Sequence, residues 1–172
     1  MGKISKLYFA QKAEALIQKA GSRCPFEIAD ELGIIVMFRS DLGNLKGMYT
    51  IIKRNAFIFI NSNLTDLMKK IVCAHELGHH TIHPHLAKGG AFKEFMLYEM
   101  DSKPEYEANI FAAELLLDTD ELLDYIYDYN YSDEQIAMAM GTDVNLVALK
   151  VGYLRELGYD LKPSDHKSDF LK

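Results

Sequence analysis

The sequence predicts an α+β fold in which a small three-stranded sheet lies beside one buried helix, with further helices towards the C-terminus. Two observations lead to this prediction. Between residues 34 and 60, three apolar runs are separated by short polar turns, which is typical of strands. After residue 61, apolar residues recur at helical spacing, and proline, glycine and capping residues stand at the boundaries.

The first elements are two helices and three strands. An amphipathic helix is predicted for residues 5–20, where Gly21 ends it, and Pro25 opens a short second helix. Residues 34–38 form a continuous apolar run and are predicted to be a buried strand. Two further strands, 48–52 and 56–60, are joined by a hairpin-like turn. Three strands are enough for a small sheet but not for a barrel.

The next helix, predicted for residues 64–81 with N-cap candidates at 61–63, carries the motif H-E-x-x-H at His75, Glu76 and His79. Residues four apart lie on the same helical face, so both histidines can bind one ion. Glu76 lies about 100° further round the helix, where it can reach a water on that ion. This pattern is typical of zinc hydrolases, with two ligands and a general base.

A catalytic zinc usually has a third protein ligand, and two candidates compete. His85 stands ten residues after His75, but the extended motif with that spacing requires glycine where this chain has Ile82. Glu107 lies on a second long helix, residues 102–117, on the side that carries its large apolar residues. A helical glutamate is often merely solvated, so spacing alone leaves the choice open.

Other polar residues receive provisional roles. Glu105 stands near the start of that helix, where the macrodipole favours a carboxylate. Glu114 has apolar neighbours and is interpreted either as a group that supports a metal ligand or as a buried partner of a histidine or backbone group. Four side chains are of a type that can stabilise an oxyanion, although a structural role is favoured for each. They are His80, His83, Tyr49 and Tyr98.

Composition restricts the class of protein. The formal net charge is −6, which does not favour binding to nucleic acid or to an anionic membrane. Two cysteines do not make a disulfide framework. No signal peptide and no apolar run long enough for a membrane span are evident, so a cytoplasmic location is expected.

The C-terminal helices, predicted for 119–129, 132–140 and 143–157, resemble a helix-turn-helix in their spacing. Residues 118–160 contain ten acidic and two basic side chains, however, so phosphate repulsion argues against DNA binding. Packing on the core or docking of a protein is favoured. We expect a core at 1–117, a helical region at 118–160 packed on it, and a flexible tail at 161–172.

Residues 74–79 and 107–116 together resemble the ImmA/IrrE family of small metallo-endopeptidases, and the resemblance covers roughly residues 34–117. It implies a reduced thermolysin-like (gluzincin) core in which a small sheet lies beside the active-site helix. It also implies that His75, His79 and Glu107 bind Zn²⁺ and that Glu76 is the catalytic base.

Two positions depart from the pattern of relatives. The second motif of the family often ends in Met-Pro, where this chain has Leu117 and Asp118. Larger thermolysin-like enzymes carry an aspartate four residues after the glutamate ligand, and Phe111 stands at that distance from Glu107. A carboxylate that supports a metal ligand would therefore have to come from elsewhere in the chain.

The expected function is that of a zinc endopeptidase whose substrate is a helix-turn-helix repressor of a phage or mobile element, which makes it an anti-repressor. This substrate is implied by the resemblance alone. The alternative is a metal-stabilised binding module that sequesters a regulator without cleaving it. The acidic helices and the tyrosines between residues 125 and 131 favour that alternative, since tyrosine is enriched at interfaces.

Overall fold

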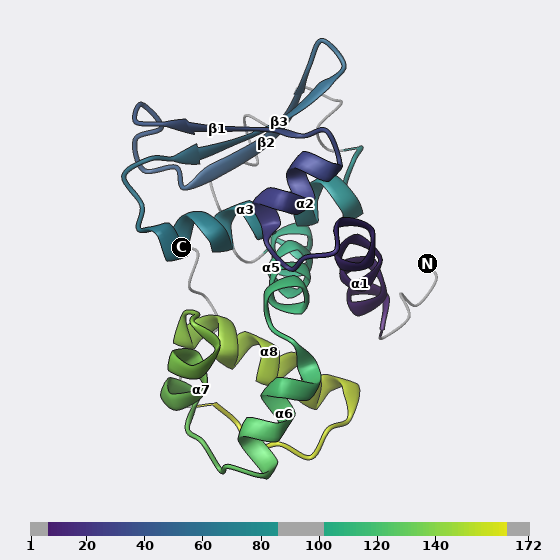
Figure 1. The fold of residues 1–172 in the computed structure, drawn as a ribbon, viewed down its shortest axis with the longest axis vertical. Coiled ribbons are helices and arrows are strands. Elements are labelled where there is room, and N and C mark those ends of the chain that lie inside the picture. The colour runs from purple at the N-terminus through teal and green to yellow at the C-terminus, as the bar shows by residue number, and fades with distance from the viewer. Residues whose placement is uncertain (1–6, 86–101, 165–172) are drawn as a thin grey trace.

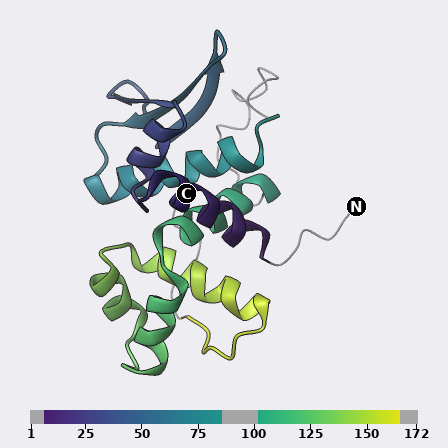
Figure 2. The same cartoon turned by 45° about the vertical axis from the view of Figure 1, so that its right-hand side comes forward.

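The computed structural model describes residues 7–85 and 102–164, and it confirms the predicted α+β class. The sheet lies at one end of the molecule, and α3 (Asp66–Ile82) runs across one of its faces (Figures 1 and 2). Helix α5 (Lys103–Leu116) crosses α3, and α1 (Tyr8–Ala20) packs against α5. The last three helices form the opposite end.

The sheet has the order β1-β3-β2, so the last strand in sequence is central. Strand β3 (Asn55–Asn61) pairs in parallel with β1 (Ile35–Arg39) and antiparallel with β2 (Gly47–Ile52). Pairing of Ile52 with Asn55 leaves a two-residue turn, Lys53–Arg54, in which both residues have positive φ, 49° and 70°. Such turns match the twist of a hairpin.

The prediction that the first strand is buried is wrong. Although β1 is apolar, Ile35, Met37 and Phe38 are 45%, 44% and 54% exposed. The strand lies at the edge of the sheet, whereas the central strand β3 has Ile58 and Ile60 in the core. Burial follows from strand order, which the hydrophobicity of one strand does not determine.

Helix boundaries follow from local side-chain chemistry. Thr65 begins α3 by accepting a hydrogen bond from Met68 N at 3.2 Å, so the N-cap is Thr65 and not a residue within 61–63. Asn61 instead donates from Nδ2 to the carbonyl oxygens of Gly43 and Leu45 at 3.1 and 3.0 Å, which fixes the loop between β1 and β2.

The remaining described helices lie on either side of the elements above in the chain. Helix α2 (Pro25–Glu31) precedes the sheet, and α6 (Thr119–Tyr127), α7 (Asp133–Met140) and α8 (Val144–Leu157) follow α5. Ser132 and Gln135 form a capping box at the start of α7. None of the described helices combines the length and the apolar character that crossing a bilayer requires.

Buried charges join the C-terminal helices to the core. Lys150 of α8 is fully buried, and its Nζ lies 2.7 Å from Oε2 of Glu114 on α5. Nearby, Arg23 donates to the carbonyl oxygen of Leu115 at 3.1 Å and to Oδ2 of Asp118 at 2.6 Å. Leu161 is also buried, so the expected tail at 161–172 begins within the packed structure; residues 165–172 lie outside the described part.

Candidate metal centre

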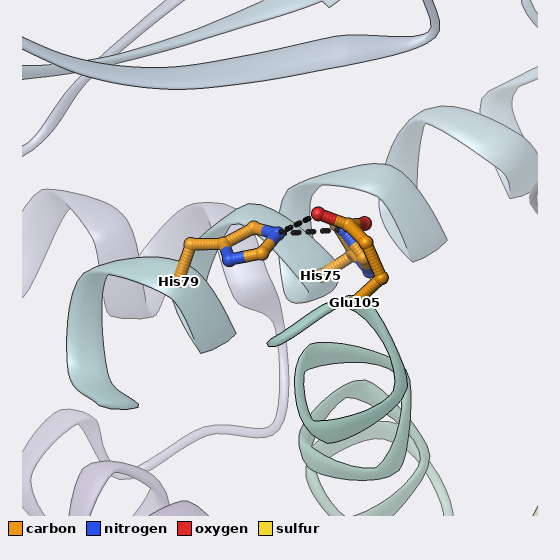
Figure 3. A group of neighbouring side chains, drawn as sticks. All are labelled: His75, His79 and Glu105. Atoms are coloured by element: carbon orange, nitrogen blue, oxygen red, sulfur yellow. Dashed lines mark hydrogen bonds and ion pairs between the residues drawn. The ribbon is translucent and has the colours of Figure 1, made fainter. Parts of the chain in front are cut away.

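Three side chains from two helices converge on one point. His75 and His79 project from the same face of α3, and Glu105 reaches them from the first turn of α5 (Figure 3). The two Nε2 atoms lie 3.0 Å apart, and the Glu105 carboxylate oxygens lie 3.1 Å from His75 Nε2 and 3.2 Å from His79 Nε2. All three side chains are buried.

This arrangement fits a metal ion. Ligand atoms that bind a tetrahedral ion at about 2.1 Å lie roughly 3.4 Å from one another. The three observed separations are slightly shorter than that value. Two imidazoles and one carboxylate also form the ligand set of many zinc hydrolases. Among the described residues, these three make the group whose donor atoms can hold an ion.

The electrostatics of the three groups reflect their burial and proximity. Burial lowers the pKa of His79 to about 4, against an opposing effect of the Glu105 carboxylate. Burial also acts to lower the pKa of His75, but Glu105 and Glu76 raise it above its ordinary value. For Glu105, burial would raise the pKa, yet hydrogen bonds with both histidines hold it well below its usual range. The carboxylate is therefore ionised and available as a ligand.

Asn109 orients the first histidine. Its Oδ1 atom lies 2.7 Å from Nδ1 of His75 and accepts a hydrogen bond from it. When it is neutral, as a metal ligand must be, an imidazole that donates from Nδ1 has its lone pair on Nε2, the atom that faces His79 and Glu105. One turn of α5 therefore supplies both Glu105 and the group that fixes the tautomer of His75.

Glu76 is buried beside this group, between α3 and the sheet. A Cβ atom at Gly47 of β2 would lie 3.1 Å from Glu76 Oε1 and would overlap Cγ1 of Val72. The absence of a side chain at Gly47 thus lets β2 approach the helix and places the Glu76 carboxylate against the strand.

Glu107, the predicted third ligand, does not lie with the two metal-helix histidines in this structure, whereas Glu105 does. Its Oε2 atom lies 2.8 Å from Nε2 of His83, and Lys103 Nζ lies 3.5 Å from Oε1. Two residues along a helix correspond to about 200° of rotation, so Glu105 and Glu107 point in different directions. His85, the other candidate, is exposed and lies outside the group.

The family model of the IrrE N-terminal-like domain, Peptidase_M78, matches residues 29–151. The chain belongs to the ImmA/IrrE family. It is 37% identical to uncharacterized immunity region protein 2 of Bacillus phage phi105 over 137 residues, which cover 80% of this chain and 85% of that protein. It is 34% identical to metallopeptidase ImmA of Bacillus subtilis (strain 168) over 131 residues, 73% of each chain.

Membership in the ImmA/IrrE family supports a peptidase that uses a metal ion. The position of Glu105 also bears on the aspartate that larger thermolysin-like enzymes carry four residues after their glutamate ligand. Counted from Glu105, the fourth residue is Asn109, so this ImmA/IrrE chain has an amide oxygen where larger thermolysin-like enzymes have an aspartate. Asn109 was not identified from the sequence because the count began at Glu107.

The remaining polar candidates take part in structural contacts. Tyr49 is buried in β2, and its hydroxyl lies 2.9 Å from Nδ1 of His80, which packs edge-on against its ring. His83 pairs with Glu107. Tyr98 lies outside the described residues. The expectation of structural roles therefore agrees with the contacts of His80, His83 and Tyr49.

Proposed function

We propose that the chain is a zinc-dependent endopeptidase in which His75, His79 and Glu105 hold Zn²⁺ and Glu76 is the general base. The single observation that carries this proposal is the convergence of the two Nε2 atoms and the Glu105 carboxylate within 3.2 Å of one another. A zinc ion held there supplies Lewis-acid polarisation of the scissile carbonyl and makes a water molecule more acidic.

Glu76 then performs the proton transfers. It follows His75 directly on α3, so its carboxylate is close to the ligand group without belonging to it. It takes the proton of the attacking water and delivers it to the nitrogen of the departing amine, which is typically worth ~10²–10⁴-fold in rate. Burial of the carboxylate between α3 and β2 limits the number of positions it can adopt.

Strand β2 offers a place for the substrate backbone. It forms one edge of the described sheet and lies next to Glu76 through Gly47. An extended peptide that adds to this edge gains main-chain hydrogen bonds and passes beside the ligand group. An extended, locally unfolded segment of a protein is the substrate that such an edge accepts.

The substrate we propose is a helix-turn-helix repressor of a phage or mobile element. Support comes from the name of the phage relative, which places that protein in an immunity region, and from the family resemblance. Repressors that bind DNA carry basic surfaces, and the acidic C-terminal helices of this chain would attract them.

The test is co-expression of the chain with the repressor encoded beside its gene, followed by mass spectrometry of the repressor. Glu76→Gln should keep the bound metal and lose cleavage, because only the proton acceptor is removed. Glu31→Gln makes the same chemical change at an exposed position of α2 and should cleave as the unmodified chain does. Cleavage by Glu76→Gln would refute the mechanism. A repressor that binds the unmodified chain with zinc but stays intact would instead support sequestration.

A further inference from the structure

Tyrosine side chains are exposed together at the turn between α6 and α7. Tyr127, Tyr129 and Tyr131 are 56%, 61% and 37% exposed. This turn lies at the end of the molecule opposite the sheet (Figures 1 and 2). Large amphipathic side chains that gather on a surface are typical of interaction sites, whereas isolated ones are ordinary.

The tyrosines are held in place before any partner binds. The rings of Tyr125 and Tyr131 stack with centroids 5.4 Å apart and planes at 6°, and Tyr129 packs against both at 6.0 and 5.6 Å. Tyr131 N donates to the carbonyl oxygen of Tyr125 at 3.0 Å, which folds the turn back onto α6. Rigid tyrosines lose little conformational entropy on binding.

The segment that carries these rings has charges of one sign. Residues 118–149 contain eight aspartates and glutamates and no lysine, arginine or histidine, a formal charge of −8. Because the whole chain carries −6, all other residues together carry +2. Lys150, the next basic residue, is buried against Glu114 and does not offset the surface charge. Tyr125 donates its hydroxyl hydrogen bond to Glu121 at 3.0 Å, so rings and carboxylates are in contact.

A groove continues from the rings. It has a volume of ≈ 590 Å³ and lies between the α6–α7 turn and the segment after α8. Tyr127 and Tyr131 form part of its lining together with the acidic residues Asp133, Glu134 and Asp160 and one basic residue, Lys162. The concave surface therefore combines aromatic faces with carboxylates.

We propose that this tyrosine–carboxylate surface is a docking site for an arginine-rich segment of a protein partner. A guanidinium group stacks on a tyrosine face and also makes paired hydrogen bonds to a carboxylate, so both features of the surface select the same side chain. Nucleic acid and anionic lipid are repelled by the same charge. The surface consists of Tyr125, Tyr127, Tyr129, Tyr131, Glu121, Asp124, Asp128 and Glu134.

The proposal rests on the proposed function in one respect, namely that the docked partner is the repressor substrate. The surface lies at the end opposite the sheet, whereas the metal centre lies between α3 and the start of α5, so a substrate that uses both must span the distance between them (Figures 1 and 3). Docking would then raise the affinity for substrate without taking part in hydrolysis.

The test measures binding of a fluorescein-labelled (Arg-Ser)₆ peptide to the full chain by fluorescence anisotropy at low salt. Asp124→Asn combined with Asp128→Asn should weaken binding about tenfold, and Tyr129→Ala by a similar factor. Both aspartates lie at the C-terminal end of α6, where an uncharged side chain does not disfavour the helix. A (Lys-Ser)₆ peptide should bind several-fold more weakly than the arginine peptide.

Two matched variants control for general effects. Glu27→Gln combined with Asp30→Asn removes the same charge from exposed positions of α2, and Phe38→Ala removes an exposed aromatic ring from β1; each should leave the peptide affinity within about twofold. Equal weakening by these controls, or unchanged binding by the Asp124 and Asp128 variant, would overturn the proposal. Glu76→Gln should bind the peptide normally, so a failure of the catalytic proposal and a failure of the docking proposal give different results.

Discussion

At the level of single residues, two glutamates two positions apart on α5 have different partners. Glu105 faces His75 and His79, whereas Glu107 faces His83. Both carboxylates are buried, so each needs its partner to compensate for the loss of hydration. The two glutamates are chemically identical, and they differ because their side chains point in different directions around the axis of α5.

The effect of removing each carboxylate should therefore differ. Glu105→Ala removes a ligand and should weaken zinc binding by more than about 100-fold, the upper range for changes in residues that only support a ligand. Glu107→Ala should retain zinc but lose about 1–3 kcal/mol of stability, because His83 keeps a buried polar atom without its partner. Metal content after gel filtration and unfolding in urea measure the two effects. Zinc retained by Glu105→Ala would contradict the assigned ligand set.

His75, Glu76 and His79 could be proposed from the sequence because their spacing along one helix determines their relative positions, and the structure brings the two imidazoles together. The sequence did not show which carboxylate lies beside the histidines, because α5 is buried on almost every side; from Glu105 to Leu115 only Tyr106 is exposed. A helix with no solvated face has no single inward stripe, so periodicity cannot show which glutamate faces α3. That choice depends on how the two helices cross.

At the level of elements, the crossing of α3 and α5 depends on a glycine. A Cβ atom at Gly78 would lie 3.1 Å from Cα and O of Ala108 and 3.2 Å from Cδ1 of Phe111. The two helix backbones are therefore in close contact one residue before His79, and this contact sets the distance from Glu105 to the histidines.

Gly78→Ala should cost about 1–3 kcal/mol of stability and weaken metal binding, because α5 must move away to admit the methyl group. The matched control is Gly152→Ala in α8, where an added Cβ meets no atom within 4 Å. That change should leave metal binding intact and stabilise the chain by roughly 0.5–1 kcal/mol through better helix propensity. Unfolding in urea and zinc competition with a chelator measure both variants. An unchanged zinc affinity in Gly78→Ala would contradict the prediction that the close approach of α3 and α5 is needed for metal binding.

The strands illustrate what local patterns can and cannot predict. Their positions were predicted within one or two residues, because apolar runs and turns are local signals. The exposure of β1 was not, because it follows from the parallel pairing of β1 with β3, and strand order is a property of the whole sheet.

At the level of the whole molecule, the pair of Lys150 and Glu114 connects the C-terminal helices to the core. The two side chains are 0% and 5% exposed, so water does not screen their interaction. Burial lowers the pKa of Lys150, and Glu114 opposes this effect. The division of the chain into a core and a helical region after residue 117 stays a prediction. The buried pair joins the two predicted parts, because Glu114 belongs to the first and Lys150 to the second.

Lys150→Met should destabilise the chain by about 3–5 kcal/mol, because Glu114 would be left as an uncompensated buried charge. The double variant Lys150→Met with Glu114→Leu should recover most of that loss, since it removes both desolvation penalties. Urea unfolding of the two single variants and the double variant gives the coupling free energy. Additive losses would mean that the two side chains do not stabilise each other.

The hairpin turn between β2 and β3 has a consequence for how the protein tolerates change. Lys53 and Arg54 both adopt a left-handed backbone that asparagine and glycine adopt more readily, at a cost of order 1 kcal/mol for each. Substitution of these two residues would therefore stabilise the folded chain, and neither of them belongs to the group of metal ligands. Descendants that acquire Asn-Gly there could accept a costly substitution near the metal centre and still fold, so the freedom to alter specificity depends partly on a turn that touches no ligand.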